Sequence, residues 1–133
     1  MIVVDTNVIA YLYLEGEFTQ QARAVYKNDS IWSAPYLWRS EFRNILTVYL
    51  RRNILTLEEC QKHIDSAARL LQNNEFEIDS DDILKLADSC TLSAYDCEYI
   101  VLAQQLSLKL VTNDKKILKE FPQDTINLKT IHS

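Results

Sequence analysis

The hydrophobic positions of this chain follow two different spacings. Short continuous apolar runs are typical of buried strands, and apolar residues that recur every three or four positions are typical of helices with one buried face. The pattern predicts strands at 2–4, 30–34, 76–78 and 109–112, with a last extended piece near 126–131. It predicts helices at 7–14, 19–26, 35–51, 56–71, 81–89, 93–106 and 114–120. Alternating strands and helices predict one α/β domain with a parallel sheet and helices on both faces.

Residues at the predicted helix starts support three of these boundaries. Pro35 stands where a first-turn proline belongs, because its missing N–H would have no helical partner there. Thr56 and Glu59 match the capping box, in which each side chain satisfies the other residue's backbone N–H. Ser93 and Asp96 repeat this pattern. The sequence therefore predicts helices that begin near these three positions.

Composition excludes several kinds of phosphate site. The 133 residues include a single glycine, Gly16, whereas average usage near 7% would give about nine. P-loops and dinucleotide-binding loops need two or three glycines at fixed spacing, because their backbone turns tightly and approaches the phosphate closely. The G-x-S-x-G elbow of serine hydrolases also needs two. We therefore expect none of these three sites.

The net charge of −5 conceals an uneven distribution along the chain. Residues 75–98 contain eight acids and one base, which leaves 11 acids and 13 bases elsewhere. Arg39 with Arg43, and Lys115 with Lys116, form basic clusters that are candidates for contact with RNA phosphates. The overall charge therefore does not exclude a nucleic-acid partner.

The cysteines indicate a reducing compartment, and the hydropathy pattern indicates a protein without a membrane span. The three cysteines, Cys60, Cys90 and Cys97, are odd in number and never spaced as C-x-x-C, which argues against a disulfide framework or a thiolate zinc site. The chain shows no basic and then apolar leader, and no stretch approaches the roughly 18 apolar residues of a membrane span. We expect a soluble cytoplasmic protein with no membrane partner and reduced cysteines.

Four carboxylates occupy positions that a solvated surface does not explain. Asp5 ends the first apolar strand and Asp114 follows the strand at 109–112, so both belong at the carboxyl edge of the sheet, where ligands bind in such folds. Glu41 and Asp96 lie along the apolar stripes of their helices. The structural alternatives are N-caps for Asp5 and Asp114, a capping box for Asp96, and an arginine salt bridge for Glu41.

Taken together, these acids favour a metal site. Like charges held together repel unless a cation neutralises them, and oxygen ligands favour hard cations such as Mg²⁺ or Mn²⁺. Such a cation activates water and stabilises the charge that develops on a phosphodiester during cleavage. We therefore expect metal-dependent phosphodiester hydrolysis, with Asp5, Asp96 and Asp114 holding the ion while Glu41 completes the charge cluster or orients the water.

The motifs around these acids resemble the PIN-domain family of nucleases, and within it the VapC-type toxins of toxin–antitoxin pairs. The D-T-N-V, E-x-x-N-x-L, S-x-x-D and T-x-D motifs stand here at 5–8, 41–46, 93–96 and 112–114. Four motifs in order cover nearly the whole chain. One departure is small, because Cys97 stands where many relatives carry alanine.

The resemblance implies a fold, an activity and a set of functional residues. The fold would be a single three-layer α/β/α domain at 1–133 with a parallel sheet of about five strands. The activity would be a Mg²⁺-dependent endoribonuclease, acting as a homodimer and inhibited by a cognate antitoxin. The implied catalytic residues are Asp5, Glu41, Asp96 and Asp114, and the implied auxiliary residues are Thr6, Asn7 and Thr112. Asp5 and Asp96 would be the foremost direct metal ligands, with Thr6 and Asn7 orienting Asp5.

Three alternatives remain beside this interpretation. A haloacid-dehalogenase-type phosphatase also begins with an Asp at a strand end, but it needs a second acid two residues later, where Asn7 stands. A PIN-like module that only binds RNA or protein would usually have lost members of the acidic set, and this chain keeps all four. A solitary housekeeping PIN protein would share every motif with a toxin.

Overall fold

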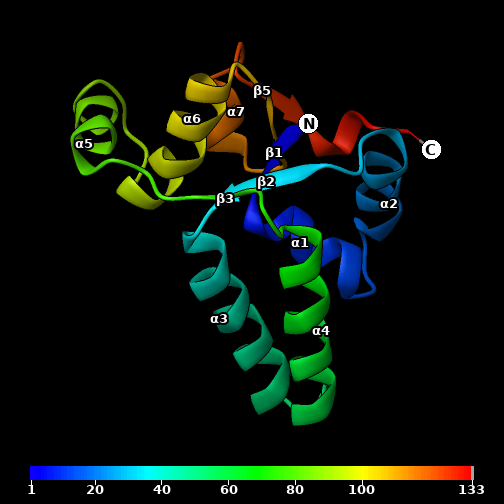
Figure 1. Ribbon diagram of the computed structural model, residues 1–133. Coiled ribbons are helices and arrows are strands. Elements are labelled where there is room, and N and C mark those ends of the chain that lie inside the picture. Colours follow the sequence, from blue (N-terminus) through cyan, green and yellow to red (C-terminus); the bar gives the residue numbers. More distant parts are fainter. Residues whose placement is uncertain (133) are drawn as a thin grey trace.

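The computed structural model describes residues 1–132 and contains a five-stranded sheet with helices on both sides (Figure 1). The strands are β1 (Ile2–Val4), β2 (Trp32–Pro35), β3 (Glu75–Phe76), β4 (Leu110–Thr112) and β5 (Thr125–Asn127). Their order is β3-β2-β1-β4-β5, and every neighbouring pair is parallel. The chain therefore starts at the centre of the sheet and builds outward first on one side and then on the other. Ligands bind where such an order reverses, here between β1 and β4.

Seven α-helices connect the strands, and one 3₁₀ turn follows the last strand within residues 1–132. They are α1 (Thr6–Tyr13), α2 (Thr19–Asn28), α3 (Leu37–Arg51), α4 (Leu57–Leu70), α5 (Ser80–Asp88), α6 (Ala94–Leu106) and α7 (Lys115–Glu120), followed by the turn at Leu128–Thr130. Figure 1 shows α6 and α7 on one side of the sheet and α1 with α2 on the other. The predicted α/β class, with three layers and a parallel five-stranded sheet, is confirmed.

The core lies on both faces of the central strands. Val3 and Val4 of β1 and Leu110 of β4 are fully buried. α6 packs across β1, β2 and β4, and α5 packs against its outer side. Helix α6 is therefore buried on several sides. The single apolar stripe expected around Asp96 is wrong for this helix, because Cys97, Ile100 and their neighbours are buried on more than one face.

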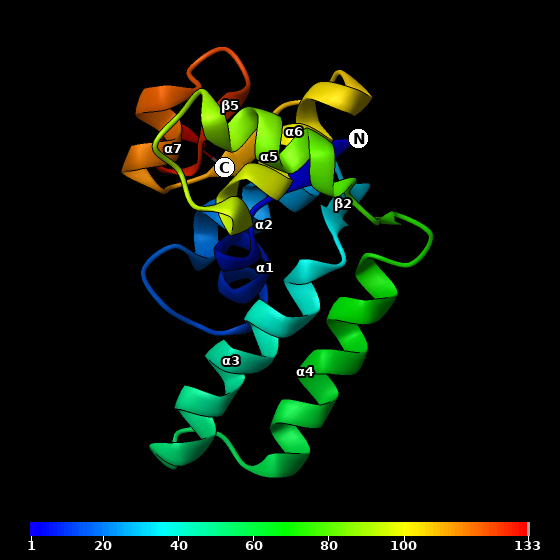
Figure 2. The ribbon, with the colours of Figure 1, turned by 90° about the vertical axis from the view of Figure 1, so that its left-hand side faces the viewer.

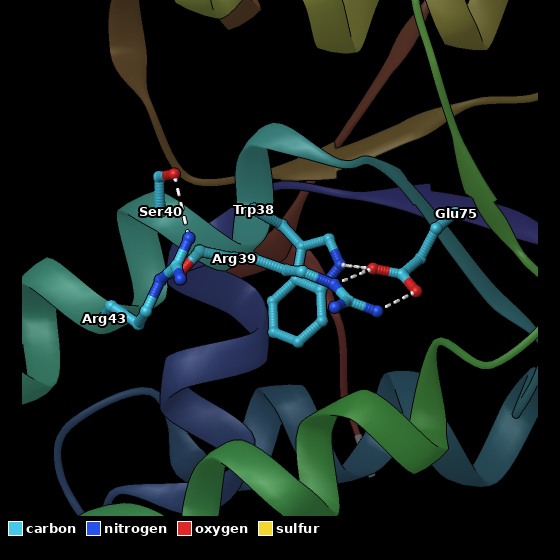
Figure 3. Close-up of polar contacts among 5 residues, drawn as sticks. All are labelled: Trp38, Arg39, Ser40, Arg43 and Glu75. Atoms are coloured by element: carbon cyan, nitrogen blue, oxygen red, sulfur yellow. Dashed lines mark hydrogen bonds and ion pairs between the residues drawn. The ribbon is translucent and has the colours of Figure 1, made fainter.

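Helices α3 and α4 form a hairpin that projects from the body of the molecule (Figure 2). Its base is tied to the edge strand β3. Trp38 Nε1 donates a hydrogen bond of 2.8 Å to Glu75 Oε2, and the Arg39 guanidinium donates to Oε2 at 2.5 Å and to Oε1 at 2.6 Å (Figure 3). Glu75 thus satisfies a buried indole and an arginine at once.

One helix start differs from the prediction. Pro35 ends strand β2 rather than opening a helix, and α3 begins at Leu37. The missing N–H of Pro35 costs no bond to β3, because the residues on either side form those bonds. Ala34 N donates to Asn74 O at 3.1 Å, and Tyr36 N donates to Phe76 O at 3.0 Å.

Other boundaries are confirmed or corrected by the polar contacts. The capping box of Thr56 and Glu59 is present in full. Ser93 caps α6 by accepting from the Asp96 N–H, without the reciprocal bond of a box. The last piece is extended only over β5, because Asn127 accepts from Lys129 N and turns the chain into the 3₁₀ turn.

The structure shows the state of the cysteines and the lengths of the apolar helices. All three cysteines are free, with Cys90 Sγ and Cys97 Sγ 3.7 Å apart. None of the helices within residues 1–132 combines the length and the apolar character needed to cross a membrane.

Candidate active site

The central strands β1 and β4 end side by side, and this brings Asp5 and Asp114 to the same edge of the sheet. Asp5 N donates to Val111 O at 3.1 Å. Thr112, which is fully buried, joins the two acids. Its Oγ1 donates to Asp5 Oδ2 at 2.8 Å and accepts from Asp114 N at 3.1 Å. The hydroxyl therefore holds one carboxylate and fixes the backbone position of the other.

Glu41 projects from the second turn of α3 toward α1 and α6. Its Oε1 accepts from Thr6 Oγ1 at 2.9 Å and from Tyr99 OH at 2.6 Å. The arginine salt bridge considered for Glu41 is absent from the ion pairs of residues 1–132. The Thr6 hydroxyl binds Glu41, which leaves the main chain of Thr6 as its contact with Asp5. Only the main-chain N–H of Thr6 acts on Asp5, where it lowers the pKa of the carboxyl group.

The charges of the four acids act on one another. Burial raises the pKa of Asp5 to about 6 against the hydrogen bond from Thr112, and the charges of Glu41 and Asp96 add to the rise. Burial also raises the pKa of Asp96, and the charges of Asp114 and Glu41 raise it further. The structure therefore collects Asp5, Glu41, Asp96 and Asp114 into one cluster of mutually repelling carboxylates.

Of the two acids that could serve as helix N-caps, Asp114 caps its helix with its side chain and Asp5 does not. Asp114 Oδ1 accepts from Lys116 N at 2.9 Å and from Ile117 N at 3.0 Å, so one of its oxygens caps α7. Asp5 occupies the N-cap position of α1, but its side chain makes no cap hydrogen bond. Asp5 therefore lies at the edge of the sheet with Thr112 as its side-chain partner.

The basic residues that are candidates for contact with RNA phosphates differ in their partners and in their position relative to the acidic cluster. The charge of Lys116 lowers the pKa of Asp96, and its Nζ donates to Thr91 O at 2.8 Å. Lys115 is exposed beside it. Arg39 is bound to Glu75, and Arg43 donates to Ser40 Oγ at 3.2 Å (Figure 3). Asn7 is exposed next to the cluster and makes no side-chain hydrogen bond within the described residues.

The chemistry of the donor set fits a hard cation. Within residues 1–132, none of the four acids forms an ion pair, so the chain offsets their repulsion only in part, through the charge of Lys116 near Asp96. No group of three or more His, Cys, Asp or Glu side chains in this part of the chain is arranged to hold a metal ion as it stands. Mg²⁺ commonly binds through one or two carboxylates and keeps several waters, so a preassembled set of three is not needed.

A further residue, Tyr99, belongs to the site although the sequence motifs did not single it out. Tyr99 is 1% exposed and hydrogen-bonds Glu41. Its position three residues after Asp96 puts both on neighbouring positions of one helix face, and a buried tyrosine hydroxyl needs a partner. Glu98 is half-buried, and burial followed by the charge of Glu41 raises its pKa.

Comparison with known proteins identifies the family of this chain. The family model described as PIN domain matches residues 2–122. The chain is 29% identical over 125 residues to ribonuclease VapC3 of Pyrobaculum aerophilum. The aligned stretch covers 91% of this chain and 95% of that protein.

Solved structures show the same fold at lower identity. PAE2754 from Pyrobaculum aerophilum has a TM-score of 0.76 at 21% identity, covering 97% of this chain and 91% of that one. A toxin–antitoxin complex from Klebsiella pneumoniae has a TM-score of 0.72 at 17% identity, covering 96% and 98%. FitAcB from Neisseria gonorrhoeae has a TM-score of 0.72 at 18% identity, covering 98% and 100%. Because the family match spans most of the chain, this protein belongs to the PIN domain family, and it resembles the VapC-type members of that family.

Proposed function

We propose that this chain is a metal-dependent endoribonuclease that hydrolyses RNA phosphodiester bonds. The observation that carries the proposal is the cluster of Asp5, Glu41, Asp96 and Asp114 at the carboxyl edge of the sheet. Half-buried carboxylates that repel one another, with no cation bound among them, are costly to hold together, and a bound cation removes that cost. The similarity to ribonuclease VapC3 over 91% of this chain supports RNA as the substrate.

Mg²⁺ is the proposed cofactor, with Mn²⁺ as a substitute. Asp5 and Asp96 would hold it directly, and Asp114 would contribute Oδ2 because its Oδ1 caps α7. When bound, the cation supplies an activated water and stabilises the developing negative charge of the phosphate. Glu41 orients the attacking water, and Thr112 keeps Asp5 oriented. Lys115 and Lys116 are the basic side chains beside the acidic cluster, and they are the proposed contacts for RNA phosphates. Arg39 is engaged by Glu75, and Arg43 lines the groove between α3 and α4.

Substitution of one proposed metal ligand tests this function. Asp96→Asn removes a charge while keeping the size of the side chain, so we expect at least a hundredfold loss of RNA cleavage in Mg²⁺. Asp88→Asn, which changes an exposed acid of α5, should cleave like the unaltered protein. EDTA should abolish cleavage and added Mg²⁺ or Mn²⁺ should restore it. An Asp96→Asn protein that cuts RNA at the unaltered rate contradicts the proposal.

We further propose that the nuclease is the toxin of a type II toxin–antitoxin pair and acts on RNA in the cytoplasm. One structural relative is itself described as a toxin–antitoxin complex, which supports a cognate antitoxin as partner. Expression of the chain should arrest growth, and Asp96→Asn should not. Co-expression of the small protein encoded beside its gene should relieve the arrest and co-purify with the chain. Growth unaffected by active enzyme would favour a solitary housekeeping nuclease.

A homodimer is the remaining proposed assembly. An apolar groove of about 340 Å³ lies between α3 and α4 and is lined by Leu46, Leu50, Leu57 and Ile64 among others. Leu57 is 60% exposed there, which favours this groove as a protein-binding surface. Leu57→Lys should therefore weaken the dimer in light-scattering measurements. Leu84→Lys, at an equally exposed leucine on α5, is the matched control. Equal dimerisation of both variants would place the interface elsewhere.

A further inference from the structure

Three helices meet at one carboxylate oxygen. Tyr99 OH, from α6, donates to Glu41 Oε1 at 2.6 Å, and Thr6 Oγ1, from α1, donates to the same oxygen at 2.9 Å. The two hydroxyls are also in direct contact with each other. Thr6, Glu41 and Tyr99 therefore form a closed triangle of polar contacts inside the candidate site.

Only two hydroxyl protons are available for the three contacts of this triangle. Either both hydroxyls donate to Glu41, or one donates to the other, which then donates to Glu41. In each arrangement Glu41 is the acceptor. Burial, and then the charge of Glu41, raise the pKa of Tyr99 above its usual range, so the phenol stays protonated and able to donate.

The second oxygen of Glu41 is left for other partners. Within residues 1–132, Glu41 Oε2 makes no hydrogen bond with the protein. It is not a buried orphan either, because Gln21 Oε1 is the one buried side-chain oxygen or nitrogen without a partner in the described part of the chain. Glu41 Oε2 is therefore in contact with solvent, while Oε1 is held.

We propose that Tyr99 is a positioning residue of this site, whose hydroxyl fixes the Glu41 carboxylate through Oε1 so that Oε2 meets the attacking water. The inference rests on the proposed nuclease function. Tyr99 is 1% exposed and Thr6 is 3% exposed, so neither hydroxyl is accessible to RNA and both act through Glu41. Thr6 performs the same task from α1.

Kinetics of matched tyrosine variants test the proposal. Tyr99→Phe removes only the hydroxyl, and the loss of a hydrogen bond to a charged group should lower kcat about tenfold to a hundredfold with KM nearly unchanged. Tyr13→Phe is the control, because it deletes another partly buried hydroxyl, which donates to Ser66 O at 3.2 Å away from the site. Its kcat should stay that of the unaltered protein. Equal losses in the two variants, or no loss in Tyr99→Phe, overturn the proposal.

Two further variants separate positioning from packing. In a Glu41→Gln background, Tyr99→Phe should lower kcat little further, because the effects of substituting residues that act as a unit are not additive. Thr6→Ser keeps the hydroxyl and should retain kcat, whereas Thr6→Val is of similar size without it and should lower kcat. Fully additive losses, or equal rates for the two Thr6 variants, contradict the positioning role.

A measurement without catalysis keeps this inference distinct from the proposed function. Urea unfolding of Tyr99→Phe, Glu41→Met and the double variant should show a coupling of roughly tenfold in the unfolding equilibrium constant. If the unfolding measurements show coupling between Tyr99 and Glu41 but the unaltered protein cleaves no RNA, the proposed nuclease function is refuted and the Tyr99–Glu41 hydrogen bond is still supported. Absence of coupling overturns the proposed role of Tyr99 whatever the activity.

Discussion

Burial raises the pKa of Asp5 to about 6, from an ordinary value of 3.8. The folded state therefore binds this proton more tightly than the unfolded chain does. Consequently the free energy of unfolding falls as the pH rises from about 4 to about 6, and the loss is complete above that range. Two pKa units correspond to about 3 kcal/mol. At neutral pH, in the absence of a cation, the ionised Asp5 side chain thus destabilises the fold.

Asp5→Asn should therefore stabilise the protein in EDTA. The substitution removes the buried charge and keeps an oxygen that can accept from Thr112, so its Tm should exceed that of the unaltered protein, and more so at pH 8 than at pH 5. Thermal unfolding followed by circular dichroism measures the difference. Asp29→Asn should lower Tm at pH 7 instead, because a hydrogen bond from the N-terminal amino group lowers the pKa of Asp29. Equal Tm changes at both pH values would contradict the burial of charge at Asp5.

At the scale of elements, helix α3 is held to the sheet by one buried acid. The Glu75 side chain is 8% exposed and binds both Trp38 and Arg39, whereas the Arg39 side chain is 49% exposed (Figure 3). The hydrogen bonds from Arg39 lower the pKa of Glu75. Because Arg39 is half in solvent, we assign the pair about 1 kcal/mol.

Glu75→Gln should lower Tm by a few degrees, because an amide oxygen still accepts from Trp38 but the charge that pairs with Arg39 is lost. Glu77→Gln is the matched control at an exposed glutamate two residues along. RNA cleavage should be nearly unchanged in both, since neither residue faces the acidic cluster. A Tm equal to that of Glu77→Gln would show that the ion pair contributes nothing.

At the scale of the whole molecule, a net charge of −5 limits how RNA can be bound. The acidic cluster repels the substrate's phosphates, and the basic residues beside it that oppose this are Lys115 and Lys116. Affinity for single-stranded nucleic acid falls with salt by a logarithmic slope of about 0.7 for each phosphate neutralised. Contact of these two lysines with about two phosphates therefore predicts a shallow slope of about −1.4.

Binding of single-stranded RNA to the inactive Asp96→Asn protein, measured at several salt concentrations, tests this slope. Lys115→Met should weaken binding and make the slope shallower by about 0.7, because one phosphate contact is lost. Lys62→Met, which alters an exposed lysine of α4 paired with Glu58, is the control and should leave the slope unchanged. A slope that Lys115→Met does not alter would remove Lys115 from the RNA path.

Part of the candidate site could be predicted because it depends on local order along the chain. Asp5 and Asp114 directly follow strands that a short apolar pattern identifies, and parallel neighbours end at the same edge. Capping by Thr56 is local as well. Pro35 shows where such signals are ambiguous, since a proline is compatible both with a helix start and with a strand position whose N–H is unused.

The sequence by itself determined the alternation of strands and helices, the positions of the four acids and the family to which they belong. The physical reason is that hydrophobic period, caps and motifs are carried by residues a few positions apart. Only the tertiary structure decided that Glu41 is held by Thr6 and Tyr99, and that Arg39 pairs with Glu75. These partners are 35, 58 and 36 residues apart in the chain, and packing of separate elements brings them within hydrogen-bond distance.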